Sequence, residues 1–350
     1  MTGRRTAAAT AIITALTLSG LALSVGDAAA QQPIVLKMAS FPPAASATSR
    51  MFNRYIEEFK QKSGGRLQLE VYHGATMGPL PRHYDLARTG VADLSFFQHG
   101  ATPGRFPLTE LTHMPYVFPD GVKGSKVATQ VAQDMIPEFL GKEHEDTHLL
   151  WIVYNRPSAV YETSRAVTKI DDLKGRRYRA PTNAVTEMLK SIGAVPVGVP
   201  ATAMAESLQK GTIDGIITDP IGVFSFRLGS LVKHHTPMMT SVISFGMTMN
   251  KARYESLPAD LRAIVDGLRG SAAAVDMTLT TWDDFPEFTK YMQDSNIKDA
   301  KLDAASDAEL KRLAAQYIDK HVAELEAKGQ PARKAFGKLK ELSAKYAAMN

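Results

Sequence analysis

Three arginines stand within four positions of the stretch KGRRYRAPTN, residues 174–183. If this stretch is a strand, alternate side chains face opposite ways, so Arg177 and Arg179 share one face. Arg176 and Tyr178 then share the other face. Arg179 would stand at the carboxyl end of the strand, just before an Ala-Pro turn. An arginine is almost never fully buried without an anionic partner, so an inward Arg179 needs a carboxylate from the protein or from a ligand.

A second chemical pattern is His-Glu-Asp-Thr-His at residues 144–148, which matches the zincin motif H-E-x-x-H. Zinc binding by that motif needs a helix, because a helix places the two histidines one turn apart. Here a helix is expected to stop near Gly141, and His148 runs directly into the apolar residues LLWIVY. We therefore predict a solvated loop without metal, and a secreted metallohydrolase is only an alternative function.

Other catalytic and cofactor-binding patterns are missing from the sequence. The chain has no cysteine, which excludes disulfides, thiolate zinc sites and cysteine nucleophiles. It contains no G-x-S-x-G elbow, no P-loop and no G-x-G-x-x-G fingerprint. The net charge is only +5, with Lys and Arg scattered among Asp and Glu, which gives nucleic-acid binding little support. We expect a protein that is not an enzyme and needs no cofactor.

Residues 1–30 have the three regions of a secretory signal peptide. Arg4 and Arg5 form the positive start, residues 11–23 are an apolar run, and residues 28–30 are a small-residue cleavage site. The apolar run is shorter than the roughly 18 residues of a membrane span, and no other candidate span follows. We therefore predict export to the periplasm as a soluble chain of about 320 residues, which is long enough for about two domains.

The rest of the chain alternates strand and helix signals, which indicates an α/β fold. The first predicted elements are a strand IVLKMAS, an amphipathic helix over residues 49–65 and a strand LQLEVY. The same order returns after residue 170, with a strand RRYRA, a helix over about 183–192, a strand VPVGV, a helix over about 202–210 and a strand IDGII. Glycine follows both of the later helices, as expected at a helix end.

One short pattern occurs in both of these regions. Gly90-Val91-Ala92-Asp93 and Gly211-Thr212-Ile213-Asp214 each follow a helical segment and lead into a strand. The echo indicates two similar lobes, although glycine caps and aspartate turns also recur by chance.

We predict a first lobe over residues 31–152, with a return segment at about 242–283. The second lobe is predicted over residues 153–241, with C-terminal helices at about 284–350. The apolar stretch at 148–155 would cross between the lobes, and the return would begin near residues 241–250.

In open α/β sheets ligands sit beyond the carboxyl ends of the strands. By that rule one cleft should collect the residues that follow the predicted strands. We assign the following residues to ligand binding: Phe41, Gln98, His99, Arg179, Thr182, Asp219 and Phe224. The planar guanidinium of Arg179 fits a carboxylate through two parallel hydrogen bonds, whereas Arg176 and Arg177 are expected to be mainly solvated. The alternatives are a salt bridge from Arg179 to Asp171 or Asp172, and a core role for the phenylalanines.

Four blocks of the sequence, in this order, resemble the solute-binding proteins of tripartite ATP-independent periplasmic (TRAP) transporters, the DctP family. They are GATMGPLPRHYDLARTGVADLSFF, FPLTELTHMPYVF, DDLKGRRYRAP and LKSIGAVPVGVPATAMAESLQKGTIDG. The resemblance implies a two-lobed, type II-like periplasmic binding protein that closes by a hinge on an organic acid and delivers it to membrane permease subunits. It also implies that Arg179 grips the ligand carboxylate.

Departures from the family pattern narrow the expected ligand. Ala159 stands where some branches have a second arginine, with Arg156 close by, and Ala201 stands where many members have a bulky aromatic residue. One sure carboxylate anchor and apolar walls favour a small monocarboxylate, aromatic or aliphatic, over a sugar acid. A sensory subunit that presents the ligand to a membrane kinase is a further alternative.

Overall fold

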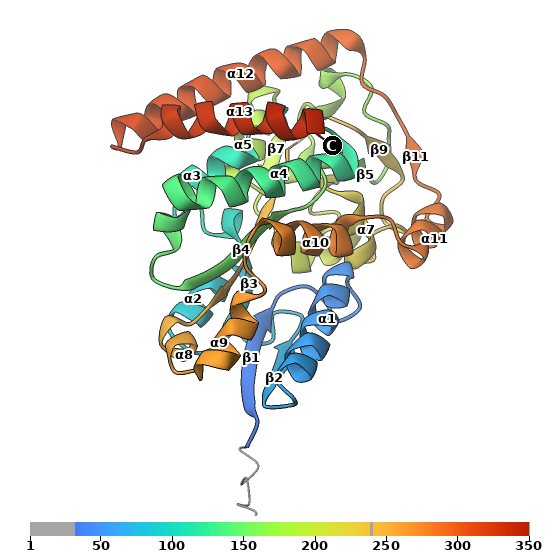
Figure 1. Ribbon diagram of the computed structural model, residues 1–350. Coiled ribbons are helices and arrows are strands. Elements are labelled where there is room, and N and C mark those ends of the chain that lie inside the picture. Colours follow the sequence, from blue (N-terminus) through green and yellow to red (C-terminus); the bar gives the residue numbers. More distant parts are fainter. Residues whose placement is uncertain (1–31, 239–240, 350) are drawn as a thin grey trace, which may run out of the picture. The chain divides into compact units, whose positions relative to one another are not determined.

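The computed structural model describes residues 32–238 and 241–349, so the predicted signal peptide at residues 1–30 lies outside the described residues (Figure 1). The first sheet has the strand order β2-β1-β3-β10-β4. Its strands are β1 (Ile34–Ser40), β2 (Leu67–Tyr72), β3 (Leu94–Gln98), β4 (His148–Tyr154) and β10 (Ser244–Met249). The second sheet has the order β11-β9-β5-β8-β6-β7. Its strands are β5 (Ala159–Glu162), β6 (Arg177–Arg179), β7 (Val195–Val197), β8 (Gly215–Thr218), β9 (His234–Thr236) and β11 (Lys298–Asp299).

Helices connect and cover these strands, which confirms the predicted α/β class. The helices before β9 in the chain are α1 (Ala47–Lys62), α2 (His83–Arg88), α3 (Pro107–Glu110), α4 (Gly121–Met135), α5 (Asn183–Ser191), α6 (Met204–Gln209) and α7 (Pro220–Ser225). The C-terminal part is helical, as predicted, with α8 (Lys251–Glu255), α9 (Ala259–Asp266), α10 (Ser271–Trp282), α11 (Pro286–Asp294), α12 (Ala304–Ala327) and α13 (Ala332–Met349). The long helices α12 and α13 lie side by side (Figure 1). Across the parts of the chain that were searched, no helix combines the length and the apolar character needed to span a bilayer.

Helix α1 shows why these elements form where the sequence predicts them. Its apolar residues recur every three or four positions, so Met51, Phe52, Tyr55 and Phe59 lie on one buried face. The helix ends at Lys62, two residues before a glycine pair whose φ angles are positive. A residue with a side chain rarely adopts that backbone conformation, so the glycines allow the chain to turn directly into β2.

The repeated Gly-x-x-Asp pattern has the same structural role in both sheets. Asp93 donates its backbone N–H to the carbonyl of Lys37 on β1 at 2.8 Å, and its Oδ2 accepts the N–H of Lys37 at 2.7 Å. Asp214 makes the same two bonds to Arg177 on β6, each at 2.8 Å. In each case the aspartate fastens the start of one parallel strand to its neighbour. The recurrence is therefore structural and not a chance repetition.

The two regions also share their strand connections. Strand β1 pairs in parallel with both β2 and β3, and β6 pairs in parallel with both β7 and β8. An antiparallel strand follows at the same place in each sheet, β10 beside β3 and β5 beside β8. The residues that follow the carboxyl ends of β1, β3, β6 and β8 are therefore placed where open α/β sheets carry a binding site.

Two connecting segments join the sheets, one after β4 and one before β10. They pair with each other, because Asn155 donates its backbone N–H to Ile243 at 3.2 Å and Ser158 donates its own to Ser241 at 2.8 Å. The predicted strands at 148–155 and 241–250 are confirmed as β4 and β10. The proposed lobe boundaries, at about residues 152 and 241, stay a prediction.

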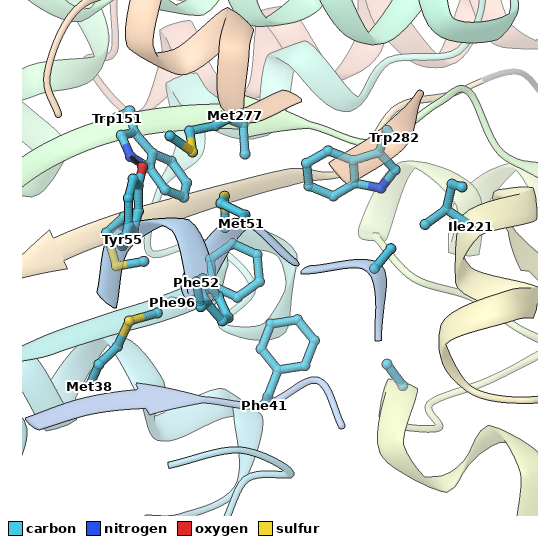
Figure 2. Packing of buried hydrophobic residues seen from close by; sticks show 14 of the residues in the cluster. Met38, Phe41, Met51, Phe52, Tyr55, Phe96, Trp151, Ile221, Met277 and Trp282 are labelled. Carbon is cyan, nitrogen blue, oxygen red and sulfur yellow. Dashed lines mark hydrogen bonds between the residues drawn. The ribbon is translucent and has the colours of Figure 1, made fainter. Parts of the chain in front are cut away.

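A large apolar core surrounds the first sheet and reaches toward the second (Figure 2). Trp151 on β4 is buried there, and its indole N–H donates to the Tyr55 hydroxyl at 2.8 Å. Burial of a large apolar side chain of this kind stabilises the fold by about 1.5–3 kcal/mol. The core therefore gives the adjoining site a rigid wall.

Candidate functional site

A small cavity lies where the carboxyl ends of strands from both sheets approach each other. Phe41, Phe96 and Gln98 line it from the first sheet, and Arg179 and Asp219 line it from the second. The cavity volume is about 50 Å³, which is space for about one or two water molecules at roughly 30 Å³ each. A ligand with one six-membered ring needs a cavity of about 150 Å³, so it would enter only if the walls moved apart.

Arg179 ends β6 and is only 4% exposed. Its Nε donates to the carbonyl of Val199 and its Nη1 to the carbonyl of Ile217, both at 3.1 Å. Within the described residues its Nη2 makes no hydrogen bond, and no carboxylate lies within 4 Å of the guanidinium. Burial lowers the pKa of Arg179 to about 10, which leaves it charged at neutral pH. The salt bridge to Asp171 or Asp172, which was the alternative to ligand binding, is therefore not formed, and no carboxylate of the described residues pairs directly with this buried cation.

Asp219 is the acidic residue of the cavity, and its carboxylate is already occupied by protein donors. Its Oδ2 accepts the side-chain amide of Asn155 at 2.7 Å, and its Oδ1 accepts the N–H of Gly222 at 3.1 Å and so caps α7. Burial raises the pKa of Asp219, and the bonds from Asn155 and Gly222 oppose that rise. The negative charge nearby supports the protonated state of Arg179 without forming an ion pair with it.

Aromatic rings form the opposite wall of the cavity. Phe41, Phe96, Phe245 and Trp282 stack in a row, with successive ring centroids 5.4, 5.5 and 5.4 Å apart. Figure 2 shows Phe41 and Trp282 facing the same space as Ile221, and all three line the cavity. These aromatic residues come from the side of the first sheet, whereas Arg179 comes from the second. The cavity thus offers flat apolar surfaces on one side and a cation on the other.

Gln98 lines the cavity and also connects the two sides. Its side-chain amide donates to the carbonyl of Pro181 at 3.2 Å. The neighbouring Gly100 lies so close to the same segment that an added Cβ would be 3.2 Å from the Pro181 oxygen and 3.3 Å from Thr182. The two walls therefore touch beside the cavity, and this contact closes one edge of the cavity.

The structure brings four of the seven predicted ligand residues to the cavity: Phe41, Gln98, Arg179 and Asp219. The other three, His99, Thr182 and Phe224, do not line it among the described residues. His99 follows Gln98 directly and so faces the other way, against Phe97 and Phe106.

Thr182 and Phe224 have other roles. Thr182 caps α5 by accepting the N–H of Val185 at 3.3 Å. Phe224 packs on Phe285 and Tyr291, outside the cavity.

The prediction that His144 and His148 form a solvated loop is wrong for both residues, because neither is solvated and His148 lies on a strand. His144 is fully buried, with its Nε2 3.0 Å from Nε2 of His99 and its Nδ1 2.8 Å from the carbonyl of Leu140. Burial lowers the pKa of His144 to about 4, so the pair is held together as neutral rings. His148 begins β4 and stacks on Tyr254. The described part of the chain contains no cluster of three or more His, Asp or Glu residues that could hold a metal ion.

Two other arginines have structural partners that the sequence did not reveal. Arg176, predicted to be solvated, pairs with the buried Glu162, which also accepts the hydroxyl of Tyr178. Arg176 and Tyr178 do share a face, as the strand alternation predicts. Arg156 donates to the carbonyl of Trp282 at 2.5 Å and to Asp284 at 2.7 Å. It does not line the cavity.

Several cavity residues were missed by the sequence analysis, above all Phe96, Phe245 and Trp282. Strand alternation could have identified Phe96, because it lies two positions before Gln98 and so shares its face. Phe245 is found only once β10 is known to lie beside β3. Trp282 carries no local signal, because its place depends on how α10 packs against the first sheet and α4.

Comparisons with known proteins agree with this architecture. A solute-binding protein of Verminephrobacter eiseniae is 28% identical over 222 residues, which cover 62% of this chain and 65% of that protein. One of Albidiferax ferrireducens is 23% identical, and the match covers 61% of this chain and 63% of that protein. The chain thus matches slightly less than two thirds of the length of these relatives.

Solved structures match nearly their whole length. A TRAP solute-binding protein from Rhodoferax ferrireducens T118, in complex with copurified benzoate, is 28% identical with a TM-score of 0.83, covering 90% of this chain and 99% of that one. A marine metagenome TRAP solute-binding protein specific for aromatic acid ligands, in complex with 3-hydroxybenzoate, is 29% identical with the same TM-score and coverage. The predicted two-lobed binding-protein fold is therefore confirmed. Since the family model for bacterial extracellular solute-binding proteins, family 7, matches residues 38–325, the chain belongs to this family, DctP.

Proposed function

We propose that this protein is the periplasmic solute-binding subunit of a TRAP transporter and that it binds a small aromatic monocarboxylate. The observation that carries the proposal is Arg179, a buried guanidinium in the cavity with no carboxylate partner among the described residues. A ligand carboxylate would supply the missing anion, and a guanidinium binds a carboxylate through charged hydrogen bonds of fixed geometry.

The wall opposite Arg179 supports an aromatic ligand. Phe41, Phe96, Phe245 and Trp282 present ring faces and edges to the cavity, and aromatic groups pack favourably against such surfaces. Benzoate and 3-hydroxybenzoate in the two similar solved structures are ligands of this class. The mostly apolar lining of the cavity favours one ring with one carboxylate over a sugar acid, whose hydroxyl groups would find few free partners.

Transport would require a cycle of opening and closing. The contacts of Gln98 and Gly100 with the Pro181 segment would form as the protein closes on its ligand, and their loss would open the cavity for release to membrane permease subunits. Export by the predicted signal peptide would place the protein in the periplasm. Nothing in the cavity resembles an assembled set of nucleophile, base and oxyanion donors, so the proposal does not include catalysis.

Calorimetry with a set of matched ligands tests the binding proposal. Benzoate should bind, benzamide should bind at least about a hundredfold more weakly because it lacks the charge, and galacturonate should not bind detectably. Bound ligand should also raise the free energy of unfolding, by about 2.7 kcal/mol at a hundredfold excess over Kd. If benzamide binds as well as benzoate, the carboxylate assignment is wrong. Loss of acid uptake in cells that lack the gene would test the transport role.

A further inference from the structure

A groove of about 540 Å³ lies outside the cavity, at the same junction between the two sides. Ser49 and Arg50 of α1 line one side of it, and Phe224, Arg227 and Phe285 line the other. The groove and the cavity are contiguous along the chain: Thr48 and Ser225 line the cavity, whereas their neighbours Ser49 and Phe224 line the groove. Between them the N–H of Ala47 donates to the hydroxyl of Ser225 at 3.3 Å, and both residues are buried. This contact joins α1 to α7 beside residues that line the two spaces.

The two arginines of the groove have uncompensated charges. Within the described residues neither Arg50 nor Arg227 forms an ion pair, and neither guanidinium donates a hydrogen bond. Glu287 also lines the groove, but its carboxylate is not within 4 Å of either arginine. Some arginines on the described surface are paired, such as Arg54 with Asp276, whereas Arg82 and Arg165 are exposed and, like the two arginines of the groove, form no ion pair there. The groove lining therefore carries one more positive than negative charge, and neither of its arginines is paired with a carboxylate.

Aromatic rings hold both guanidiniums in place. Arg50 lies 3.9 Å from the ring centre of Phe285, and Arg227 lies 4.8 Å from that of Phe224. The two rings are in edge-to-face contact, with centroids 5.3 Å apart, so both cations stand on one continuous aromatic surface. Arg227 also has a φ of 53°, a conformation that favours glycine, two residues after the end of α7. Glycine would adopt this backbone conformation with less strain than arginine does.

We propose that the groove is an outer binding site for organic carboxylates, at which Arg50 and Arg227 collect the anion before it enters the cavity. This inference rests on the proposed function, because it assigns the same class of ligand to both sites. Cations beside a cleft raise the local concentration of an anionic ligand and its association rate. The aromatic surface would hold the ring of an aryl acid while the guanidiniums hold its charge. Opening of the contact between Ala47 and Ser225 would then connect the two sites.

The test measures association and dissociation rates of benzoate by stopped-flow fluorescence. Trp282 lines the cavity and stacks on Phe245, so it reports occupancy of the inner site. The test variant is Arg50→Gln with Arg227→Gln. The matched control is Lys320→Gln with Lys328→Gln, which removes the same charge from the end of α12, away from both sites.

At low ionic strength the arginine variant should bind benzoate about three- to tenfold more slowly than the parent, with a dissociation rate changed by less than about twofold. The difference should disappear at about 0.5 M salt, where charges are screened over a few ångströms. The lysine control should keep the parent rate within about twofold.

An unchanged association rate in the arginine variant would overturn the inference, as would an effect confined to dissociation. The inference would also be overturned if the arginine variant keeps its benzoate binding rates but no longer supports uptake in cells. The groove would then bind an acidic surface of a partner protein instead of the ligand. If the parent does not bind benzoate or any other aryl acid at equilibrium, the proposed function itself fails. The two failures are thus distinguishable.

Discussion

Replacing Arg179 by methionine should abolish ligand binding while changing the stability of the ligand-free protein little. Burial lowers the pKa of Arg179 to about 10, and at about 1.4 kcal/mol for each pH unit the folded protein carries a cost of ~3 kcal/mol for this charge. Methionine removes that cost. It also leaves the carbonyls of Val199 and Ile217 without donors, at about 1–3 kcal/mol each. The two effects oppose each other, so we expect a net change in unfolding free energy within about 3 kcal/mol.

Ligand affinity should respond much more strongly than stability. Truncating one partner of a buried, hydrogen-bonded charge pair costs about 2–5 kcal/mol, which corresponds to a rise in Kd of about thirtyfold to several thousandfold. Arg179→Lys should also bind poorly, because an ammonium keeps the charge but not the planar pair of donors. The matched control is Arg177→Met, which removes the same charge from the same strand. Arg177 is half exposed and paired with Asp214, so its loss should change Kd by less than about threefold.

Calorimetry with benzoate and urea unfolding without ligand, on all three variants and the parent, separate the two roles. The reasoning is refuted if Arg179→Met folds and binds like the parent, because the carboxylate anchor would then lie elsewhere. It is also refuted if Arg179→Met loses much more than 3 kcal/mol of stability, since the side chain would then be chiefly structural. A protein that has lost binding but unfolds near the parent midpoint is the expected result.

Three further predictions concern residues outside the ligand contacts. Gly100→Ala should raise the Kd for benzoate about fivefold, because a Cβ 3.2 Å from the Pro181 oxygen hinders closure. Gly337→Ala, where a Cβ meets nothing within 4 Å, is the control in the same titration, and equal effects would contradict the closure argument. Burial raises the pKa of Glu143 to about 7, so its folded form binds a proton more tightly than its unfolded form, and stability should fall by up to ~3 kcal/mol as the pH rises from about 4.5 to 7. Urea unfolding of Glu143→Gln across that range should lack this decline, and a profile parallel to the parent would exclude Glu143 as its source. Finally, His144→Ala should lower the unfolding free energy by about 2–4 kcal/mol, because it opens a space in the core and leaves His99 without its partner. Bound zinc in the parent, detected by metal analysis and lost in this variant, would revive the metallohydrolase alternative.

The fold could be predicted from the sequence where local patterns and tertiary contacts agree. The elements around β1 and β6 have regular apolar spacing and glycine at the helix ends, and they form where expected. The repeated aspartates were visible as a pattern, although only the structure shows that each makes the same two bonds to a neighbouring strand. Strand β5 had no comparable signal, and its Glu162 explains why Arg176 is paired instead of solvated.

The site could be predicted only in part, because it is assembled from distant segments. Arg179 and Asp219 stand at strand ends, where a general rule places ligands. The same rule wrongly included His99, which does not line the cavity because consecutive residues of a strand face opposite ways. Trp282 could not be found, because nothing in a C-terminal helix indicates that its last residue reaches the first sheet. His144 was misjudged because a polar motif gives no sign that it will be buried beside another histidine.

The repeated aspartates also allow the two sides of the cavity to be compared position by position. Asp93 bonds Lys37 and Asp214 bonds Arg177. Two residues further along each strand, the first sheet has Ala39 and the second has Arg179. Ala39 packs beneath α2 against Leu86 and Ala92, so that side carries no charge at the equivalent point. The ligand's charge would therefore be recognised by one side alone and its ring by the other.

This division implies an order of selection. In the open protein the ligand carboxylate would bind Arg179 first. The ligand ring would contact the aromatic wall only when the protein closes. An acid of the wrong shape should then associate as fast as benzoate and leave faster, whereas benzamide should show no association phase. Equal association rates of benzoate and benzamide in stopped-flow traces would show that the charge and the ring are recognised in the same step.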